Sequence, residues 1–242
     1  MKIALIGYGK MGKEIEQIAL LEGHEVICRI NQTNADIEFQ KLKNADVAIE
    51  FSSPSCAYEH ILKCFSYQIP VVCGSTGWNA QLEMAKDKCI AENQSFFYAS
   101  NFSIGVHIFF KANERLAELM QSEANYQVNI EEIHHLQKKD YPSGTAISLV
   151  EGIISHSEKK NWVACLEEKN ENTDENTIQI LSKRQNGIPG THIVKYKSEI
   201  DTIELIHTAH NRKGFAIGAL KAASWLMGKK GFFGMDDLIQ KK

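Results

Sequence analysis

The residues best suited to chemistry lie together between positions 130 and 148, in "IEEIHHLQKKDYPSGTAIS". This stretch contains two adjacent histidines, His134 and His135, and Lys138 follows four residues after His134. A histidine titrates near neutral pH and can deliver a proton to a substrate. A proton donor with a lysine close by in the sequence is therefore the first candidate for a catalytic site.

The sequence "YPSGTA" begins a helix-like segment, for which Ser143 is the expected N-cap. The first N–H groups of a helix have no acceptor within the helix, and the helix dipole favours negative charge there. The N–H groups of Gly144 and Thr145, with Lys138 nearby, therefore form a candidate receptor for a carboxylate. Each residue alone also fits a solvated loop with a capping serine, but together they favour a site for an anionic substrate.

The paired histidines end a segment, "YQVNIEEIHH", in which apolar and polar residues alternate as they do in a strand. Neighbouring side chains of a strand point to opposite faces, so only one of His134 and His135 can face a given site. Two residues of "KRQNGIPGTHIV", Arg184 and His192, are further candidates for the same site.

A second kind of chemistry is indicated near the start of the chain by "GYGKMG". Gly7, Gly9 and Gly12 have G-x-G-x-x-G spacing, directly after a strand-like run and directly before a helix-like one. Glycine permits the tight turn and lets backbone N–H groups approach a pyrophosphate, which the helix N-terminus attracts. A glycine-rich turn without a ligand is the alternative, but this position between a strand and a helix favours dinucleotide binding.

Dinucleotide-binding domains usually carry an acidic residue about 20 positions further on, which bonds the adenosine ribose. Here Asn31 follows "VICRI" at that place, and Asp36 is a second candidate that lies late in the sequence for the role. An asparagine can bond a hydroxyl without repelling a 2′-phosphate, and Lys10 and Arg29 lie near enough in sequence to offer that phosphate a cation. We therefore expect NADPH to be accepted as well as NADH.

The elements that must position these residues follow two patterns. Strand-like and helix-like runs alternate over the first hundred residues, which predicts an α/β domain with a Rossmann-type, doubly wound parallel sheet. Its expected strands are "KIALIG", "HEVICRI", "ADVAIEFS", "PVVCGST" and "SFFYASN". The turns "FSSP" and "CGSTGW" follow two of these strands, at the edge where such sheets bind ligands.

Beyond about residue 103 the pattern changes to a second, α+β domain with an open mixed sheet. Its strands "TIQILSKR", "THIVKYKS" and "DTIELIHTA" alternate between apolar and polar residues, so one face of the sheet is expected to be solvated. The final helix, around "FAIGALKAASWLMG", is expected to return to the first domain. We thus predict a dinucleotide-binding domain of residues 1–103 and 213–242, and a substrate-binding domain of residues 104–212.

Composition excludes several classes of function. Hydrophobic residues make up 43% of the 242 residues and the net charge is -3, which suits a globular protein and gives no basic excess for binding nucleic acid or an anionic membrane. No apolar run reaches the roughly 18 residues of a membrane span, and "MKIALIG" enters a strand without a signal-peptide pattern, so a cytoplasmic protein is expected. Six cysteines without metal-ligand spacing predict reduced thiols and no metal site.

Taken together, these motifs carry a resemblance. The stretch "EIHHLQKKDYPSGTA" resembles the substrate motif of the dihydrodipicolinate reductase family. The resemblance extends over nearly the whole chain, through "GYGKMG", "FSSP", "GSTGW", "SNFSIGV", the R-x-x-G-x-x-G-x-H pattern from Arg184 to His192, "RKGFAIGALKAASWL" and "GFFGMDDLI". Their order and spacing make the resemblance specific.

The resemblance implies roles for residues of both domains. It makes His134 the general acid and Lys138 its catalytic partner, with the substrate carboxylates bound by His135, Ser143, Gly144 and Thr145. For the cofactor it implies contacts with Gly7, Gly9, Lys10, Met11, Gly12, Asn31, Phe51, Ser53, Gly74, Thr76, Ser100 and Phe102. The chain departs from the family at Asn31, where many relatives have Glu, and at Ser75, where Thr is usual.

The resemblance also implies the reaction, an NADH- or NADPH-dependent reduction of 4-hydroxy-tetrahydrodipicolinate to tetrahydrodipicolinate in lysine and diaminopimelate biosynthesis. The substrate would be a small dicarboxylate bound in a cleft between the domains, with hinges near residues 101–105 and 211–214. The second domain would also carry the interface of a homotetramer.

Two other functions fit part of the sequence. An oxidoreductase of the same architecture that acts on another imine or semialdehyde would share the glycine turn but not the pattern of His134, Lys138 and "PSGT". A nucleotide-sensing protein without catalysis would share the first domain, but it would have no use for an acid, a lysine and an anion-binding helix start together.

Overall fold

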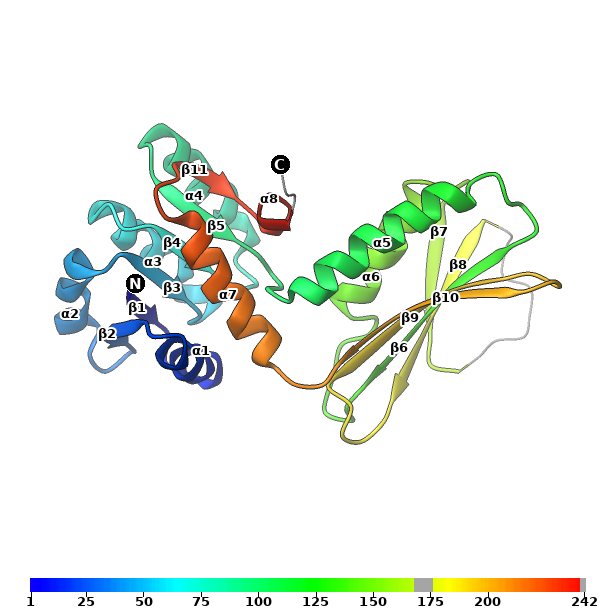
Figure 1. Cartoon of the computed structure of the whole chain (residues 1–242), viewed down its shortest axis with the longest axis horizontal. Coiled ribbons are helices and arrows are strands. Elements are labelled where there is room, and N and C mark those ends of the chain that lie inside the picture. The colour runs from blue at the N-terminus through cyan, green and yellow to red at the C-terminus, as the bar shows by residue number, and fades with distance from the viewer. Residues whose placement is uncertain (168–175, 240–242) are drawn as a thin grey trace. The chain divides into compact units, whose positions relative to one another are not determined.

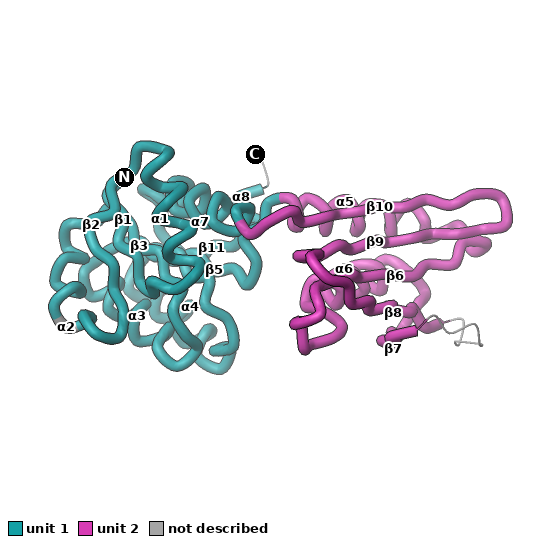
Figure 2. Tube along the Cα trace, turned by 90° about the horizontal axis from the view of Figure 1, so that it is seen from below, with its two compact units in different colours: residues 1–104, 213–242 teal, residues 105–212 magenta. Residues whose placement is uncertain are grey.

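The computed structural model describes residues 1–167 and 176–239 (Figure 1). The chain forms two compact units, one of Met1–Ile104 with Lys213–Lys242 and one of Gly105–Arg212, which we call unit 1 and unit 2 (Figure 2). The chain passes between the units at residues 104–105 and 212–213, within the two segments expected to act as hinges. What each unit binds stays a prediction at this point.

Unit 1 contains a six-stranded sheet in the order β11-β5-β4-β3-β1-β2, and every strand pair in it is parallel. The strands are β1 Lys2–Ile6, β2 Glu25–Ile30, β3 Val47–Glu50, β4 Val71–Cys73, β5 Ser95–Tyr98 and β11 Gly231–Phe233. The first five confirm the expected strands. The sixth, β11, was not predicted; it is a short strand at the edge of the sheet, where its pairing with β5 places it.

Helices cover both faces of this sheet, which confirms the doubly wound prediction (Figure 1). The helices α3 Pro54–Ser66 and α4 Asn79–Ala91 enclose one apolar cluster with the sheet, and α1 Lys10–Leu21 and α7 Lys213–Leu226 enclose the other. The return of the final helix to the first unit is thereby confirmed. The shorter helices of the unit are α2 Ala35–Glu38, the 3-10 helix η1 Phe39–Asn44, and α8 Met235–Ile239.

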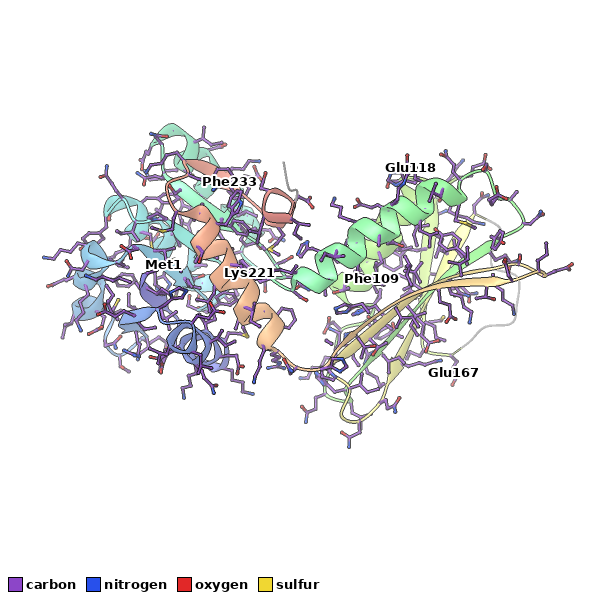
Figure 3. The ribbon with its side chains drawn as sticks, in the orientation of Figure 1. Met1, Phe109, Glu118, Glu167, Lys221 and Phe233 are labelled. Atoms are coloured by element: carbon purple, nitrogen blue, oxygen red, sulfur yellow. The ribbon has the colours of Figure 1, made fainter. Side chains whose placement is uncertain are left out.

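Strand β1 is apolar on both faces because both faces of the sheet are covered. In β1 the four residues from Ile3 to Ile6 are all at most 1% exposed. Phe233 of β11, labelled in Figure 3, packs edge-on against Trp225 of α7 with ring centroids 5.1 Å apart. The order β2-β1-β3 places β1 between strands that lead outward in opposite directions, which makes the carboxyl ends of β1 and β3 the ligand-binding switch point of such a sheet.

Unit 2 contains a five-stranded mixed sheet in the order β10-β9-β6-β8-β7, as predicted for an open mixed sheet. Its strands are β6 Gln127–His134, β7 Asn161–Cys165, β8 Thr177–Arg184, β9 Gly190–Lys197 and β10 Thr202–Ala209. The strand pairs β6–β8 and β7–β8 are parallel, whereas β9 runs antiparallel to both β6 and β10. Strand β7 was not predicted, since "NWVAC" shows no clear alternation.

One face of this sheet carries the core of unit 2. The helices α5 Ile104–Met120 and α6 Gly144–Ile154 lie against it, with an apolar cluster that includes Phe109 (labelled in Figure 3), Leu149, Ile180 and Val194. β10, whose residues alternate between exposed and half-buried, has none that is fully buried, which agrees with the expected solvated face. Within the described ranges, the helices are too short or too polar for any of them to cross a membrane.

Candidate active site

The glycine turn after β1 is in backbone contact with the loop after β3. Gly7 has a φ of +90°, and a Cβ added to it would lie 2.2 Å from the carbonyl oxygen of Phe51. A Cβ on Gly12 would lie 2.3 Å from the oxygen of Gly7, so helix α1 also requires glycine where it passes the turn. Only glycine fits at Gly7, because another residue would be both strained and in collision.

Phe51 connects this turn to the loops after β4 and β5. A Cβ on Gly74 would meet the Phe51 ring at 2.2 Å, and the rings of Phe51 and Phe102 lie 5.6 Å apart. The Ser52 N–H also donates a hydrogen bond of 2.9 Å to the hydroxyl of Ser75. The structure therefore brings these predicted cofactor residues to one edge of the sheet.

Space for a ligand opens at the middle glycine of the turn. A Cβ on Gly9 would meet nothing within 4 Å, unlike the crowded positions of Gly7 and Gly12. Gly9 is the N-cap of α1, whose first residue Lys10 is exposed. The open space beside the first N–H groups of a helix fits a pyrophosphate, so the turn fits a dinucleotide.

The remaining cofactor candidates follow strands of the same sheet. Met11 is half-buried in the first turn of α1, Ser53 is the N-cap residue of α3, and Thr76 and Ser100 are exposed after β4 and β5. Phe102, only 2% exposed, can support Phe51 but offers little surface of its own.

Arg29, expected to offer a cation to a 2′-phosphate, is instead paired with the carboxylate of Glu16. Its Nε donates to Oε1 of Glu16 at 2.5 Å, and the Tyr8 hydroxyl donates to the other oxygen of the same carboxylate. Asn31 is engaged as well, since its Oδ1 accepts from the N–H and the hydroxyl of Thr33 at 2.9 and 2.6 Å. The Asp36 side chain lies outside the described part of the chain.

Sequence reasoning missed Glu50, a fully buried carboxyl at the end of β3. It accepts hydrogen bonds from the Ser52 N–H at 3.0 Å and from the Cys73 thiol at 3.1 Å, and His60 Nδ1 lies 3.4 Å away. Burial alone would raise the pKa of Glu50, but these hydrogen bonds, with those from the hydroxyls of Ser52 and Ser75, lower it below its usual value. Glu50 thus holds together the loops that follow β3 and β4.

In unit 2 the buried face of β6 changes from apolar to polar toward its end. Ile130, Glu132 and His134 alternate along that face, and all three are buried. In the sheet register, Glu132 lies opposite Ser182 of β8 and His192 of β9. These polar side chains therefore meet at the end of β6, where the sequence placed the candidate acid.

Glu132 is the centre of this group and is 0% exposed. Its carboxylate accepts hydrogen bonds from the Ser182 hydroxyl at 2.8 Å and from the Ser143 N–H at 3.0 and 3.2 Å. The Arg184 guanidinium lies 3.9 Å away. A buried carboxylate needs such partners, because burying it without them would cost several kcal/mol.

Ser143 is the N-cap of α6, as predicted: its hydroxyl accepts a hydrogen bond of 3.2 Å from the Ala146 N–H. The same hydroxyl lies 3.0 Å from Nε2 of His192. Because Ser143 is 4% exposed and its N–H is bound to Glu132, both of its polar groups are already engaged. Direct binding of substrate by Ser143 stays a prediction, while the more exposed Gly144 and Thr145 remain the better candidates.

Lys138 lies in the loop after β6, where its ammonium bonds the carboxylate of Asp140 at 2.6 Å. That contact lowers the pKa of Asp140. Arg184 holds the loop on β8, since its guanidinium donates to the carbonyl oxygens of Lys138 at 3.2 Å and Asp140 at 2.9 Å. Arg184 and His192, named from the sequence as further candidates, therefore do belong to this site.

Burial changes the expected titration of the two histidines. The pKa of His134 is lowered first by burial, and the positive charges of Lys138 and Arg184 lower it further, while Glu132 acts in the opposite direction. Burial lowers the pKa of His192 to about 3. His134, the predicted proton donor, is thus harder to protonate than the sequence alone suggested, and the carboxylate of Glu132 opposes this effect.

Ligand atoms of Glu132, His134 and His192 lie within 4.8 Å of one another, so these residues could also hold a metal ion. The carboxylate of Glu132, however, is already bonded to Ser143 and Ser182. Hydrogen bonds account for the position of Glu132, and His134 can act as a proton donor only if its ring nitrogens carry protons rather than a metal ion.

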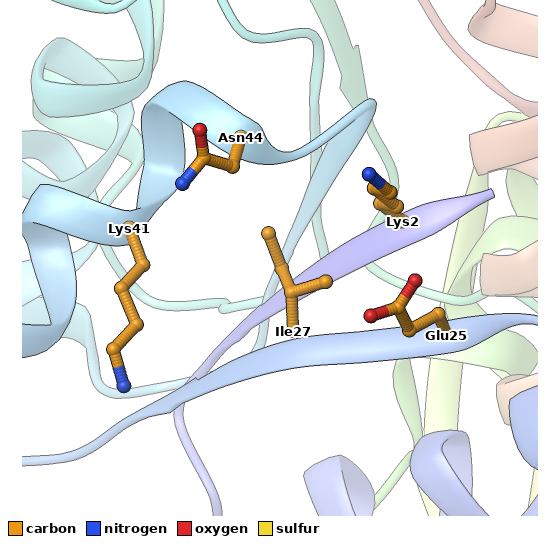
Figure 4. Close-up of a pocket in the computed structure, with 5 residues that line it drawn as sticks. All are labelled: Lys2, Glu25, Ile27, Lys41 and Asn44. Atoms are coloured by element: carbon orange, nitrogen blue, oxygen red, sulfur yellow. The ribbon is translucent and has the colours of Figure 1, made fainter.

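One pocket of unit 2 is lined by Leu166, Ser182, Lys183, Arg184 and Gln185. Another pocket lies at the amino ends of β1 and β2 in unit 1 (Figure 4). Its lining consists of residues at the starts of β1 and β2 and in η1, namely Lys2, Glu25, Ile27, Lys41 and Asn44. It contains none of the predicted site residues.

Comparison with known proteins gives one consistent result. Family models described as "Dihydrodipicolinate reductase, N-terminus" and "Dihydrodipicolinate reductase, C-terminus" match residues 1–102 and 105–239. A 4-hydroxy-tetrahydrodipicolinate reductase from Christiangramia forsetii is 46% identical over 242 residues, covering 99% of this chain and 98% of its own. One from Staphylococcus aureus is 34% identical and covers 98% of this chain and 100% of its own.

Among solved structures, a dipicolinate-bound dihydrodipicolinate reductase from Paenisporosarcina sp. TG-14 has the same fold. Its TM-score is 0.77 at 23% identity, and the match covers 98% of this chain and 99% of that one.

Proposed function

The chain belongs to the dihydrodipicolinate reductase family, and we infer from this that it reduces 4-hydroxy-tetrahydrodipicolinate to tetrahydrodipicolinate. The reductant is NADH or NADPH, and the product serves lysine and diaminopimelate biosynthesis. The observation that carries the proposal for this chain is the site in unit 2, where a buried histidine, a lysine and the capped start of a helix come together.

We propose that the carboxylates of the substrate bind at the start of α6. The N–H groups of Gly144 and Thr145 have no acceptor within the helix, and Lys138 adds a positive charge. β6 ends at His134, so the alternation of a strand does not fix the direction of His135, and His135 is a further donor for the same ligand. These groups hold the ring so that His134 can reach it.

His134 then supplies the proton. Loss of the C4 hydroxyl as water first converts the substrate to the conjugated imine. Hydride addition at C4 of this imine moves an electron pair toward C3 and the ring nitrogen, and proton transfer from His134 completes the reduction. Lys138 stabilises the developing negative charge and helps to place the acid. General acid catalysis of this kind typically contributes about a hundred- to ten-thousandfold in rate.

The glycine turn of unit 1 holds the dinucleotide. When bound, the nicotinamide supplies the hydride. Gly7 and Gly12 keep the turn compact, Gly9 leaves room for the pyrophosphate, and Phe51 fixes the loops after β3 and β4 around it.

Oxidation of NADH and of NADPH in the presence of freshly made 4-hydroxy-tetrahydrodipicolinate tests the proposed function. We expect oxidation that depends on the substrate. Tight binding of nucleotide without oxidation would favour a nucleotide sensor, and oxidation only with another imine or a semialdehyde would favour a different oxidoreductase.

We also propose a homotetramer joined through unit 2. The face of its sheet opposite α5 and α6 carries a row of paired residues across four strands, namely Ile206, Ile193, Glu131 and Leu181. Ile206 is 57% exposed, and with the half-buried Ile193 and Leu181 it gives this face apolar surface that another chain would cover. Light scattering on the wild type and on Ile206→Lys tests this, and a wild-type monomer would contradict it.

A cytoplasmic location is part of the same proposal. Burial raises the pKa values of the Cys28 and Cys89 thiols to about 11, so these thiols stay protonated and unreactive at neutral pH. Buried thiols of this kind suit a reducing compartment.

A further inference from the structure

His134 shares its surroundings with one carboxylate. Glu132 lies two residues earlier in β6 and therefore on the same face of the sheet, with its Oε2 3.6 Å from Nδ1 of His134. Among the described residues, Nδ1 of His134 has no hydrogen-bond partner, and the Glu132 carboxylate that faces it can accept its proton.

The other side of the imidazole is bounded by β9. A Cβ on Gly190 would lie 3.1 Å from Nε2 of His134, so the missing side chain leaves room at that nitrogen. The His192 ring packs edge-on at 5.0 Å between centroids. The ring thus has Nδ1 facing a buried carboxylate and Nε2 beside the space that a side chain at position 190 would fill.

We propose that Glu132 is a positioning residue for the acid: it accepts the Nδ1 proton of His134 and so makes Nε2 the nitrogen that gives its proton to the substrate. This proposal rests on the proposed function, in which His134 is the acid. A carboxylate that holds the imidazole in one tautomer and stabilises the imidazolium is a recurring arrangement in catalytic sites.

The electrostatic surroundings require such a carboxylate. The titratable and charged groups that interact with His134 come from β6, β8, β9 and the loop after β6, and they are Glu132, His135, Lys138, Asp140, Arg184 and His192. Two of these are anions: Asp140, which is exposed and bonded to Lys138, and Glu132, which is buried and faces Nδ1 of His134. Burial and the positive charges of Lys138 and Arg184 lower the pKa of His134 and Glu132 opposes them, so removal of the Glu132 charge should lower this pKa further.

The same carboxylate also anchors the substrate-binding end of the site. It accepts the Ser143 N–H at 3.0 Å, next to the two N–H groups proposed to bind the substrate. Glu132 therefore fixes the acid and the carboxylate receptor relative to one another through a single buried group.

Glu132→Gln tests the inference, because glutamine has the same size and keeps an oxygen to accept from Ser143 and Ser182, but it has no charge. An opposite charge at this distance changes a pKa by about 1–3 units. We expect the alkaline limb of the pH profile of kcat/KM to move to lower pH by about 1–3 units. At a pH above this limb, the rate should fall about tenfold for each unit of the shift. The fall should be in kcat, with KM for the cofactor unchanged.

Ser182→Ala is the matched control. It removes one hydrogen bond to Glu132 and keeps the charge, so its alkaline limb should stay at the wild-type position. If the limb of Glu132→Gln also stays there while His134→Gln is strongly impaired, Glu132 has no such role and the proposed function stands. If His134→Gln is as active as the wild type, the proposed acid itself is wrong.

A measurement on the wild-type protein needs no substitution. The ¹⁵N chemical shifts of the His134 ring report which nitrogen carries the proton in the neutral form. We expect the Nδ1–H tautomer, and the Nε2–H tautomer would overturn the inference even if Glu132→Gln does not fold.

Discussion

Replacement of the first two glycines of the "GYGKMG" turn should separate folding from cofactor binding. At Gly9 an added methyl meets nothing within 4 Å, and the backbone φ of −84° suits alanine. At Gly7 the methyl would lie 2.2 Å from the Phe51 carbonyl oxygen, and the φ of +90° is unfavourable for alanine. The two substitutions add the same group to the same turn, so each serves as the control for the other.

The expected magnitudes follow from these surroundings. Gly7→Ala adds backbone strain of about 1–3 kcal/mol to a collision that typically costs about 1–3 kcal/mol, so the free energy of unfolding should fall by about 2–6 kcal/mol. Gly9→Ala should lower it by less than about 1 kcal/mol, the difference between glycine and alanine at an N-cap. Its methyl instead fills the space proposed for the pyrophosphate, which should weaken NADH binding about 5- to 150-fold.

Urea unfolding without cofactor and calorimetric titration with NADH measure the two effects. If Gly9→Ala binds NADH as tightly as the wild type, the open space at the turn is not the pyrophosphate site. If Gly7→Ala is as stable as the wild type, the close approach of the turn to Phe51 does not exist in solution.

Three further predictions concern unit 2. Gly190→Ala should lower kcat by at least about tenfold, because the added methyl would crowd Nε2 of His134. Steady-state kinetics measure this, and an unchanged kcat would contradict the prediction. His192 has a folded pKa of about 3 against an ordinary 6.5, so the folded state binds fewer protons and stability is lost as pH falls from 6.5 toward 3. At pH 4.5 this loss of stability is about 2–3 kcal/mol. Urea unfolding at pH 7 and at pH 4.5 should show the loss in the wild type but not in His192→Asn. An equal loss in the variant would show that His192 is not its cause. Arg184→Ala should raise KM for the dicarboxylate substrate through a loosened 138–140 loop, and an unchanged KM would argue against that support.

The fold could be predicted from the sequence wherever hydrophobic periods were long. The five strands β1 to β5 and the helices between them show clear runs bounded by turns, and the mixed sheet of unit 2 shows clear alternation. Strands β7 and β11 were missed because a short edge strand is specified by its neighbours rather than by its own pattern.

The site could be predicted less completely, for a physical reason. His134, Lys138 and Ser143 are close in sequence, so their spacing alone placed them together. Glu132 and Glu50 were missed because a carboxylate inside an alternating strand looks like a solvated residue until its partners from other strands are known. The pairing of Arg29 with Glu16 was also missed, because it joins a strand to a helix and cannot be predicted from either segment alone.

The central claim is that His134 gives the proton for the reduction, and the His134→Gln variant tests it most directly. We expect the variant to bind dipicolinate, used as a planar dicarboxylate probe, as tightly as the wild type and to oxidise NADH or NADPH about 100- to 10,000-fold more slowly with substrate present. Turnover equal to that of the wild type would contradict the account.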